Sequence, residues 1–162
     1  MMMTRLASFK LAAICCCFLA LAACSKKNTP DLDAGTSNAK PGSQQDFTLN
    51  VGDRVYFSED QSTLTPEAED TLRKQAQWLQ QYGGVTVQIE GHADERGTRE
   101  YNISLSARRA TATREFIIAQ GVDGGRISSI AYGKERPVAL CDAEQCWSQN
   151  RRAVTVITGG AN

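Results

Sequence analysis

Residues 85–110 read VTVQIEGHADERGTREYNISLSARRA, and the succession of patterns in this stretch decides the fold. Val85, Val87 and Ile89 alternate with polar residues, which is the period of a half-buried strand. The polar run Gly91–Gly97 ends the alternation and indicates a loop. A helical period follows from about Asn102 to Gln120. One stripe of that helix is formed by Ser106, Ala110, Thr113 and Ile117. The stretch therefore predicts a strand, a polar loop and a helix.

The flanking segments supply one more helix and further strands. Thr65-Pro66 begins a helix, because threonine caps a first turn and proline fits the first helical position. The inward face of this helix repeats Ala68, Leu72, Ala76 and Leu79. Strand character marks residues 55–57, 127–132 and 153–157, and 137–148 indicates a loop. We expect an α+β fold of order β-α-β-α-β-β, with two helices on one face of a mixed sheet. Phe47, Leu49 and Val51 also alternate, which allows an additional N-terminal strand.

The N-terminus has the pattern of an export signal. Arg5 and Lys10 precede an uncharged apolar run that ends in Leu21-Ala22-Ala23-Cys24. Such a run is too short for an ordinary membrane-spanning helix and ends in small residues, as a cleaved signal does. The Leu-Ala-Ala-Cys sequence resembles a bacterial lipobox, which implies removal of residues 1–23 and lipidation of Cys24. Ser25 then favours the outer membrane over the inner membrane. The alternative is an ordinary signal peptide with a chance cysteine at its end.

Composition divides the remaining chain into a tail and one domain. Residues 24–45 are polar and predict a flexible tether behind Cys24, and residues 46–160 form the folded domain. The chain has 18 basic and 18 acidic residues. Because the leader removes two of the basic ones, the processed form is slightly acidic. Without a broad positive surface or a polybasic tract, we expect no nucleic-acid partner.

Cys141 and Cys146 are the two cysteines beyond Cys24. An even pair in an exported chain fits a single disulfide that closes a small loop. A two-ligand metal site is the alternative, but no third or fourth ligand lies nearby in the sequence.

Asp94 in the polar loop and Arg109 in the next helix are the candidate binding residues. A carboxylate and a guanidinium in one cleft, beside a helix N-terminus, would suit a zwitterion such as an amino-acid head group. The alternative is that Asp94 and Arg109 form an ion pair that only pins the loop.

The stretch GHADERGTREYNISLSARRA, residues 91–110, resembles the signature of OmpA C-terminal-like domains, and more narrowly that of the peptidoglycan-associated lipoproteins. Residues 55–57, 132–137 and 150–154 extend the resemblance, which covers about residues 46–158. It implies an OmpA-like sandwich that binds the diaminopimelate group of the peptidoglycan stem peptide. Asp94 would bind the free ammonium and Arg109 the free carboxylate.

The resemblance also implies supporting residues. Asn102, Leu105 and Ser106 would shape the loop and the helix start, with Leu105 acting through its backbone N–H. Asp60 would lie beside the ligand. Glu59 departs from the family, which more often has an aromatic or aliphatic residue there. The segment with Cys141 and Cys146 also differs from better-known relatives.

The implied location and partners follow from the same family. The domain would face the periplasm from the outer membrane and take part in the Tol-Pal system of envelope integrity and cell division. Its protein partner would be the propeller TolB. Because the polar segment Glu95–Tyr101 borders the expected pocket, a partner that covers this rim would compete with the cell wall. The alternative is a protein-interaction module that mainly docks such a partner, with Asp94 and Arg109 structural.

An enzyme is not expected. His92 is the only histidine, and the chain contains neither an HExxH nor a Gly-x-Ser-x-Gly pattern. Glu90 and Asp94 form an acidic pair of the kind that occurs by chance. We expect no catalytic residue, metal or cofactor, and we expect His92 to be a structural hydrogen-bonding residue at the strand end.

Overall fold

The computed structural model describes residues 39–162. The predicted leader 1–23, the lipidated Cys24 and residues 25–38 of the tether lie outside these residues. Of the helices described, none has both the length and the apolar character needed to cross a membrane.

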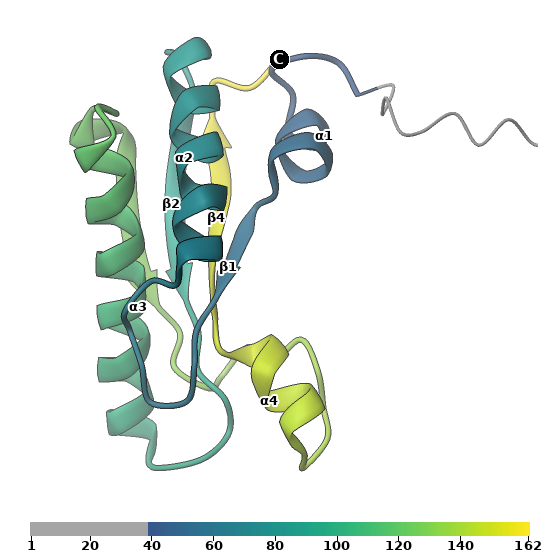
Figure 1. Ribbon diagram of the computed structural model, residues 1–162, viewed down its shortest axis with the longest axis vertical. Coiled ribbons are helices and arrows are strands. Elements are labelled where there is room, and N and C mark those ends of the chain that lie inside the picture. Colours follow the sequence, from purple (N-terminus) through teal and green to yellow (C-terminus); the bar gives the residue numbers. More distant parts are fainter. Residues whose placement is uncertain (1–38) are drawn as a thin grey trace, which may run out of the picture. The chain divides into compact units, whose positions relative to one another are not determined.

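The centre of the fold is a four-stranded mixed sheet of order β1-β4-β2-β3 (Figure 1). Its strands are β1 (Arg54–Tyr56), β2 (Thr86–Gly91), β3 (Ile127–Ala131) and β4 (Arg152–Gly159). β4 runs antiparallel to both β1 and β2, and β2 runs parallel to β3. The register pairs Ile89 with Thr155 and Ser129, so the long central strands carry most of the ladder.

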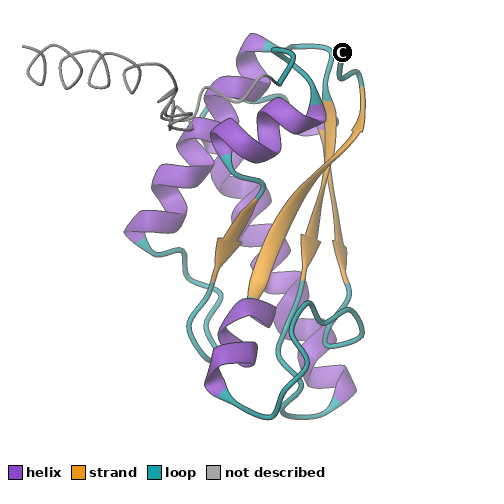
Figure 2. Ribbon diagram, turned by 90° about the vertical axis from the view of Figure 1, so that its right-hand side faces the viewer, coloured by secondary structure: helices purple, strands orange, loops and turns teal. Residues whose placement is uncertain are grey.

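Two long helices, α2 (Pro66–Gln81) and α3 (Arg99–Ala119), cover one face of the sheet (Figures 1 and 2). The predicted apolar faces of both helices are buried in the core, together with Val85, Val87 and Ile89 of the strand side. Thr65 caps α2 as expected, because its side chain accepts a hydrogen bond from the amide of Ala68. The predicted α+β class and the order of the main elements are confirmed.

The N-terminal part of the domain differs from the prediction. Residues 44–51 form a short helix α1 (Gln44–Asp46) and a π-helical turn η1 (Phe47–Val51) instead of an additional strand. Phe47 is buried against Trp78, and Asp46 accepts a hydrogen bond from the Trp78 indole. Phe47 is thus buried from a helical turn, and the alternation of residues 47–51 does not correspond to a strand. The ordered fold also begins before residue 46, since Ser43 caps α1.

The segment expected to be a loop over 137–148 contains helix α4 (Glu144–Asn150). A disulfide joins Cys141 to Cys146 with 5.7 Å between their Cα atoms, which is the pairing expected from the C-x4-C spacing. The Asn150 side chain also accepts hydrogen bonds from the amides of Val138 and Ala139. The segment before α4 is thus joined to α4 by the disulfide and by the hydrogen bonds to Asn150.

Helix α3 begins at Arg99, three residues earlier than predicted. Thr98 is its N-cap and accepts a hydrogen bond from the amide of Tyr101. Its close approach to the sheet depends on Gly91, because a Cβ there would lie 2.0 Å from the carbonyl oxygen of Ser106. A short η2 turn (Gly124–Arg126) connects α3 to β3.

Candidate functional site

A cleft of about 200 Å³ lies where the loop after β1, the loop after β2 and the first turns of α3 meet. It combines acidic, basic and apolar side chains. Its lining residues are Glu59, Asp60, Asp94, Arg96, Gly97, Tyr101, Asn102, Leu105 and Arg109. Two separate loops and one helix therefore place five of the six residues selected from the sequence around a single small space, all except Ser106.

Asp94 follows the end of β2 and is only 7% exposed. Its Oδ1 accepts hydrogen bonds from the Arg96 amide (3.1 Å) and Nε (3.3 Å), and its Oδ2 from Arg96 Nη2 (2.7 Å). Arg151 Nη1 lies 3.4 Å from the same Oδ2. Burial raises the pKa of Asp94, but hydrogen bonds and charge from Arg96 outweigh it, so that the pKa lies below its usual value. The carboxylate is ionised at neutral pH.

Arg109 lies fully buried on α3. Its guanidinium donates to three backbone carbonyls: Nε to Gln61 (2.8 Å), Nη1 to His92 (3.0 Å) and Nη2 to Ser58 (3.1 Å). These bonds tie α3 to the loops after β1 and β2. Burial lowers the pKa of Arg109 to about 10, which still leaves the group charged at neutral pH.

No carboxylate among residues 39–162 forms an ion pair with Arg109. The alternative of an Asp94–Arg109 ion pair is therefore wrong, because the partners of Asp94 are Arg96 and Arg151. The three carbonyls occupy part of the donor set of a guanidinium, which has five N–H groups. Arg109 is a buried cation on a cleft wall, paired only with neutral acceptors.

Asp60 and Asn102 also line the cleft. Asp60 adopts a left-handed backbone (φ +54°), and its carboxylate accepts a hydrogen bond from the Tyr101 hydroxyl at 3.0 Å. Asn102 is buried, and its amide nitrogen donates to the Arg96 carbonyl at 2.6 Å. Asn102 thus fixes the far end of the loop that carries Asp94.

Leu105 and Ser106 have other positions than expected. Because α3 begins at Arg99, the Leu105 amide lies inside the helix, beyond the first four N–H groups that lack helical partners. Leu105 is buried and lines the cleft. Ser106 does not line it: its buried Oγ donates to the Ile103 carbonyl and accepts from the Gly133 amide. Ser106 joins α3 to the turn after β3.

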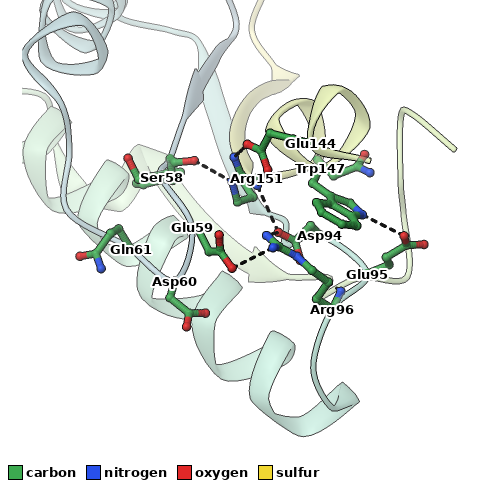
Figure 3. A network of polar contacts seen from close by, with 12 residues as sticks. Ser58, Glu59, Asp60, Gln61, Asp94, Glu95, Arg96, Glu144, Trp147 and Arg151 are labelled. Carbon is green, nitrogen blue, oxygen red and sulfur yellow. Dashed lines mark hydrogen bonds and ion pairs between the residues drawn. The ribbon is translucent and has the colours of Figure 1, made fainter. Parts of the chain in front are cut away.

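Sequence reasoning missed a second set of charged residues at the cleft (Figure 3). Arg96 bridges Asp94 and Glu59, with 2.8 Å from its Nη1 to Glu59 Oε1. Arg151, from the end of α4, pairs with both Asp94 and Glu144. Arg96 stands two residues from Asp94, which was a usable signal. Arg151 is 57 residues away, and only the fold brings it to the site.

His92 does not make the hydrogen bonds expected of it. The ring is 2% exposed, and neither nitrogen has a hydrogen-bond partner within residues 39–162. Burial, with a smaller effect of the Arg152 and Arg136 charges, lowers the pKa of His92 to about 4. The ring is therefore neutral at physiological pH, and its backbone carbonyl serves the site through Arg109.

The cleft presents a cation and a carboxylate, so a ligand with one positive and one negative group would match its charges. A ligand carboxylate would meet Arg109, and a ligand ammonium would meet Asp94. Among residues 39–162 there is no cluster of three or more His, Cys, Asp or Glu side chains suited to a metal ion.

Comparison with known proteins gives concordant matches. The model of the OmpA family matches residues 56–151. A peptidoglycan-associated lipoprotein of Brucella melitensis is 60% identical over 87% of this chain and 87% of that protein. One of Rhizobium meliloti is 57% identical over 89% of this chain and 85% of that protein. The crystal structure of the peptidoglycan-associated lipoprotein from Burkholderia pseudomallei has a TM-score of 0.64 and 38% identity, and the match covers 65% of this chain and 90% of that one.

Proposed function

Because this chain belongs to the OmpA family and, within it, to the peptidoglycan-associated lipoproteins, we propose that its cleft binds diaminopimelate in the stem peptides of peptidoglycan. The binding is noncovalent. As a member of this family the protein is a wall-associated lipoprotein and not an enzyme.

The observation that carries the proposal is the buried Arg109 guanidinium on the cleft wall, without a carboxylate partner in residues 39–162. A buried cation favours an anion strongly, because little water competes for it. The free carboxylate of diaminopimelate supplies that anion. Three backbone carbonyls hold the guanidinium in place beforehand, so binding orders few groups.

Asp94 supplies the opposite charge for the ligand ammonium. Its low pKa keeps it ionised, and its 7% exposure places it at the cleft rather than in open solvent. Asp60 adds a second carboxylate on the facing loop. Because Asp94 and Arg109 hold opposite charges at a fixed separation, they select a zwitterion whose charges have a matching separation. A ligand with a single charge would bind only one of the two residues.

The rest of the chain makes this binding a tether. Residues 24–45, with acyl groups on Cys24, would hold the domain at the periplasmic face of the outer membrane. A single cleft needs only modest affinity, because many copies on one membrane face one continuous polymer. The function is then to fasten the outer membrane to the cell wall, as part of the Tol-Pal system in envelope integrity and cell division.

Docking of TolB is the second proposed interaction. The rim Glu95–Tyr101 is mostly exposed and borders the cleft, so a partner seated there would cover the ligand. We expect partner and stem peptide to compete. TolB affinity that stays unchanged at saturating stem peptide would refute the competition.

The wall-binding proposal is tested on the ligand as well as on the protein. We expect the protein, isolated in detergent, to cosediment with diaminopimelate-type sacculi and to bind the free stem peptide. Amidation of the diaminopimelate carboxylate removes the partner of Arg109 and should weaken binding about tenfold or more, since charge-assisted hydrogen bonds contribute roughly 1.5–3 kcal/mol. Comparing amidated and free stem peptides leaves the protein unchanged, so a difference in binding cannot come from an unfolded variant.

Asp94→Asn tests the other half of the site, with the exposed Asp142→Asn as a control for lost charge. We expect Asp94→Asn to lose most binding and Asp142→Asn to match the wild type. Equal affinity for amidated and free stem peptides, together with full binding by Asp94→Asn, would contradict the proposed site.

A further inference from the structure

Arg96 already occupies the carboxylate that the ligand needs. Its Nη2 lies 2.7 Å from Asp94 Oδ2, and its Nε lies 3.3 Å from Oδ1. An incoming ammonium seeks the same two oxygens. Arg151 Nη1 also lies 3.4 Å from Oδ2, so the carboxylate already has two cationic partners. A ligand ammonium that takes the hydrogen-bonding positions of Arg96 on these oxygens displaces the Arg96 side chain from Asp94.

Two contacts outside Asp94 hold Arg96 in its present position (Figure 3). Glu59 pairs with Arg96 Nη1 at 2.8 Å. The ring of Trp147 lies under the guanidinium, with 4.2 Å from Arg96 Cζ to the ring centroid. Trp147 does not line the cleft, so it acts on the site through Arg96.

Trp147 is itself held in a fixed place. Its indole nitrogen donates to Glu95 Oε1 at 2.8 Å. Trp147 lies on α4, which the Cys141–Cys146 disulfide joins to the preceding segment. Arg151, at the end of α4, pairs with both Asp94 and Glu144. A rigid support of this kind keeps the aromatic face under Arg96 at little cost in side-chain entropy.

We propose that Trp147 is a positioning residue that holds Arg96 on Asp94 and thereby lowers the affinity of the cleft for the ligand ammonium. The inference rests on the proposed function for its ligand. Any contact that stabilises the occupied state of Asp94 must be lost when the ligand takes its place, so it subtracts from the binding free energy. We call residues 141–150, which contain the disulfide and α4, the latch, because they hold Trp147 against Arg96.

Removing Trp147 should raise the affinity for the stem peptide, whereas removing a residue that contacts the ligand would lower it. Trp147→Ala should bind the stem peptide about two- to fivefold more tightly, as expected for the loss of an exposed cation–π contact. Trp147→Phe keeps an aromatic face and should return the affinity toward that of the wild type. Isothermal titration of the protein in detergent measures all three. Tighter binding restored by phenylalanine is an outcome that a purely structural role would not produce.

A second readout needs no ligand. If Trp147 holds Arg96, then Trp147→Ala should raise the apparent pKa of the Asp94 carboxyl, followed by NMR, and Trp147→Phe should restore it. Unchanged Asp94 titration, or weaker peptide binding by Trp147→Ala, overturns the latch while wild-type binding upholds the proposed function. If the wild type binds no stem peptide, the proposed function fails, and the Asp94 titration alone decides whether the latch exists.

Discussion

At the scale of single residues, the cleft is characterised by the buried charges of Asp94 and Arg109. Arg109 is fully buried, and the described contacts of its guanidinium are neutral carbonyls and the ring of Phe57, 5.2 Å from its Cζ. The same side chain therefore both joins three segments and offers a cation to a ligand. These two roles need different experiments, because a variant that unfolds also loses binding.

Arg109→Lys separates the two roles. Lysine keeps the charge, but its compact ammonium cannot reproduce the planar fork that meets carbonyls in several directions. We expect the free energy of unfolding to fall by about 1–3 kcal/mol, since at least one buried carbonyl loses its donor. Urea denaturation measures this. The neighbouring Arg108 is exposed, and Arg108→Lys should leave stability unchanged; equal stability of both variants would contradict the structural role of Arg109.

His92 should make the stability of the domain depend on pH. The folded pKa of about 4 lies below the ordinary 6.5, so the unfolded chain binds the proton more readily. Stability from this group is complete above about pH 6.5 and is lost as pH falls to about 4, by roughly 3 kcal/mol. The charged groups around the ring are Glu90, Arg152 and Arg136, with Tyr132 beside it.

His92→Phe removes the titration while keeping a ring of similar size. Urea unfolding at several pH values should show a smaller loss of stability between pH 6.5 and 4 in the variant than in the wild type. Parallel pH profiles of the two proteins would mean that the ring is not held neutral in the fold.

At the scale of elements, local chemistry explains which parts of the fold could be predicted. The start and the inward face of α2 could be predicted from local sequence, because Thr65-Pro66 and the apolar period mark them. Residues 47–51 alternate like a strand, but the pocket around Trp78 selects a helical turn for Phe47. Helix α4 has little periodicity of its own, so the sequence indicates a loop there, although the cysteine spacing predicts the disulfide.

The same division holds for the site. Asp94 and Arg109 stand out in the sequence as opposite charges on a loop and the following helix, and the fold brings both to one cleft. That Arg109 is buried among carbonyls depends on Gln61 and Ser58 of the loop after β1, 48 and 51 residues away, which no local pattern reveals. The partnership of Asp94 with Arg151 is equally distant in sequence.

Helix α2 offers a local test at this scale. Thr65→Ala removes the acceptor for the Ala68 amide and should lower stability by about 1 kcal/mol, whereas Thr65→Ser keeps the cap. Thermal unfolding compares the two. Because the cap lies outside the cleft lining, both variants should bind sacculi like the wild type. A binding defect in Thr65→Ala at a temperature where it is folded would show that α2 contributes to the site.

At the scale of the whole molecule, the proposed function depends on many weak sites acting together. If Arg96 competes with the ligand for Asp94 as proposed, single-site affinity would be held low. Low single-site affinity allows each copy to detach and rebind along the wall. Under the proposed lipid anchoring, many copies on one membrane would meet the polymer at a high effective concentration, which would compensate for the weak binding of a single cleft.

Cys24→Ser tests this dependence, because it removes the proposed lipid attachment and leaves the cleft residues unchanged. We expect the variant to leave the membrane fraction and to bind free stem peptide with wild-type affinity. Wild-type protein in lipid vesicles should retain sacculi far longer than the soluble variant, and retention should rise more steeply than in proportion to its surface density. The opposite result is retention that is equal for anchored and soluble protein and rises only in proportion to the number of copies. That result would mean that one cleft suffices and that anchoring adds no avidity.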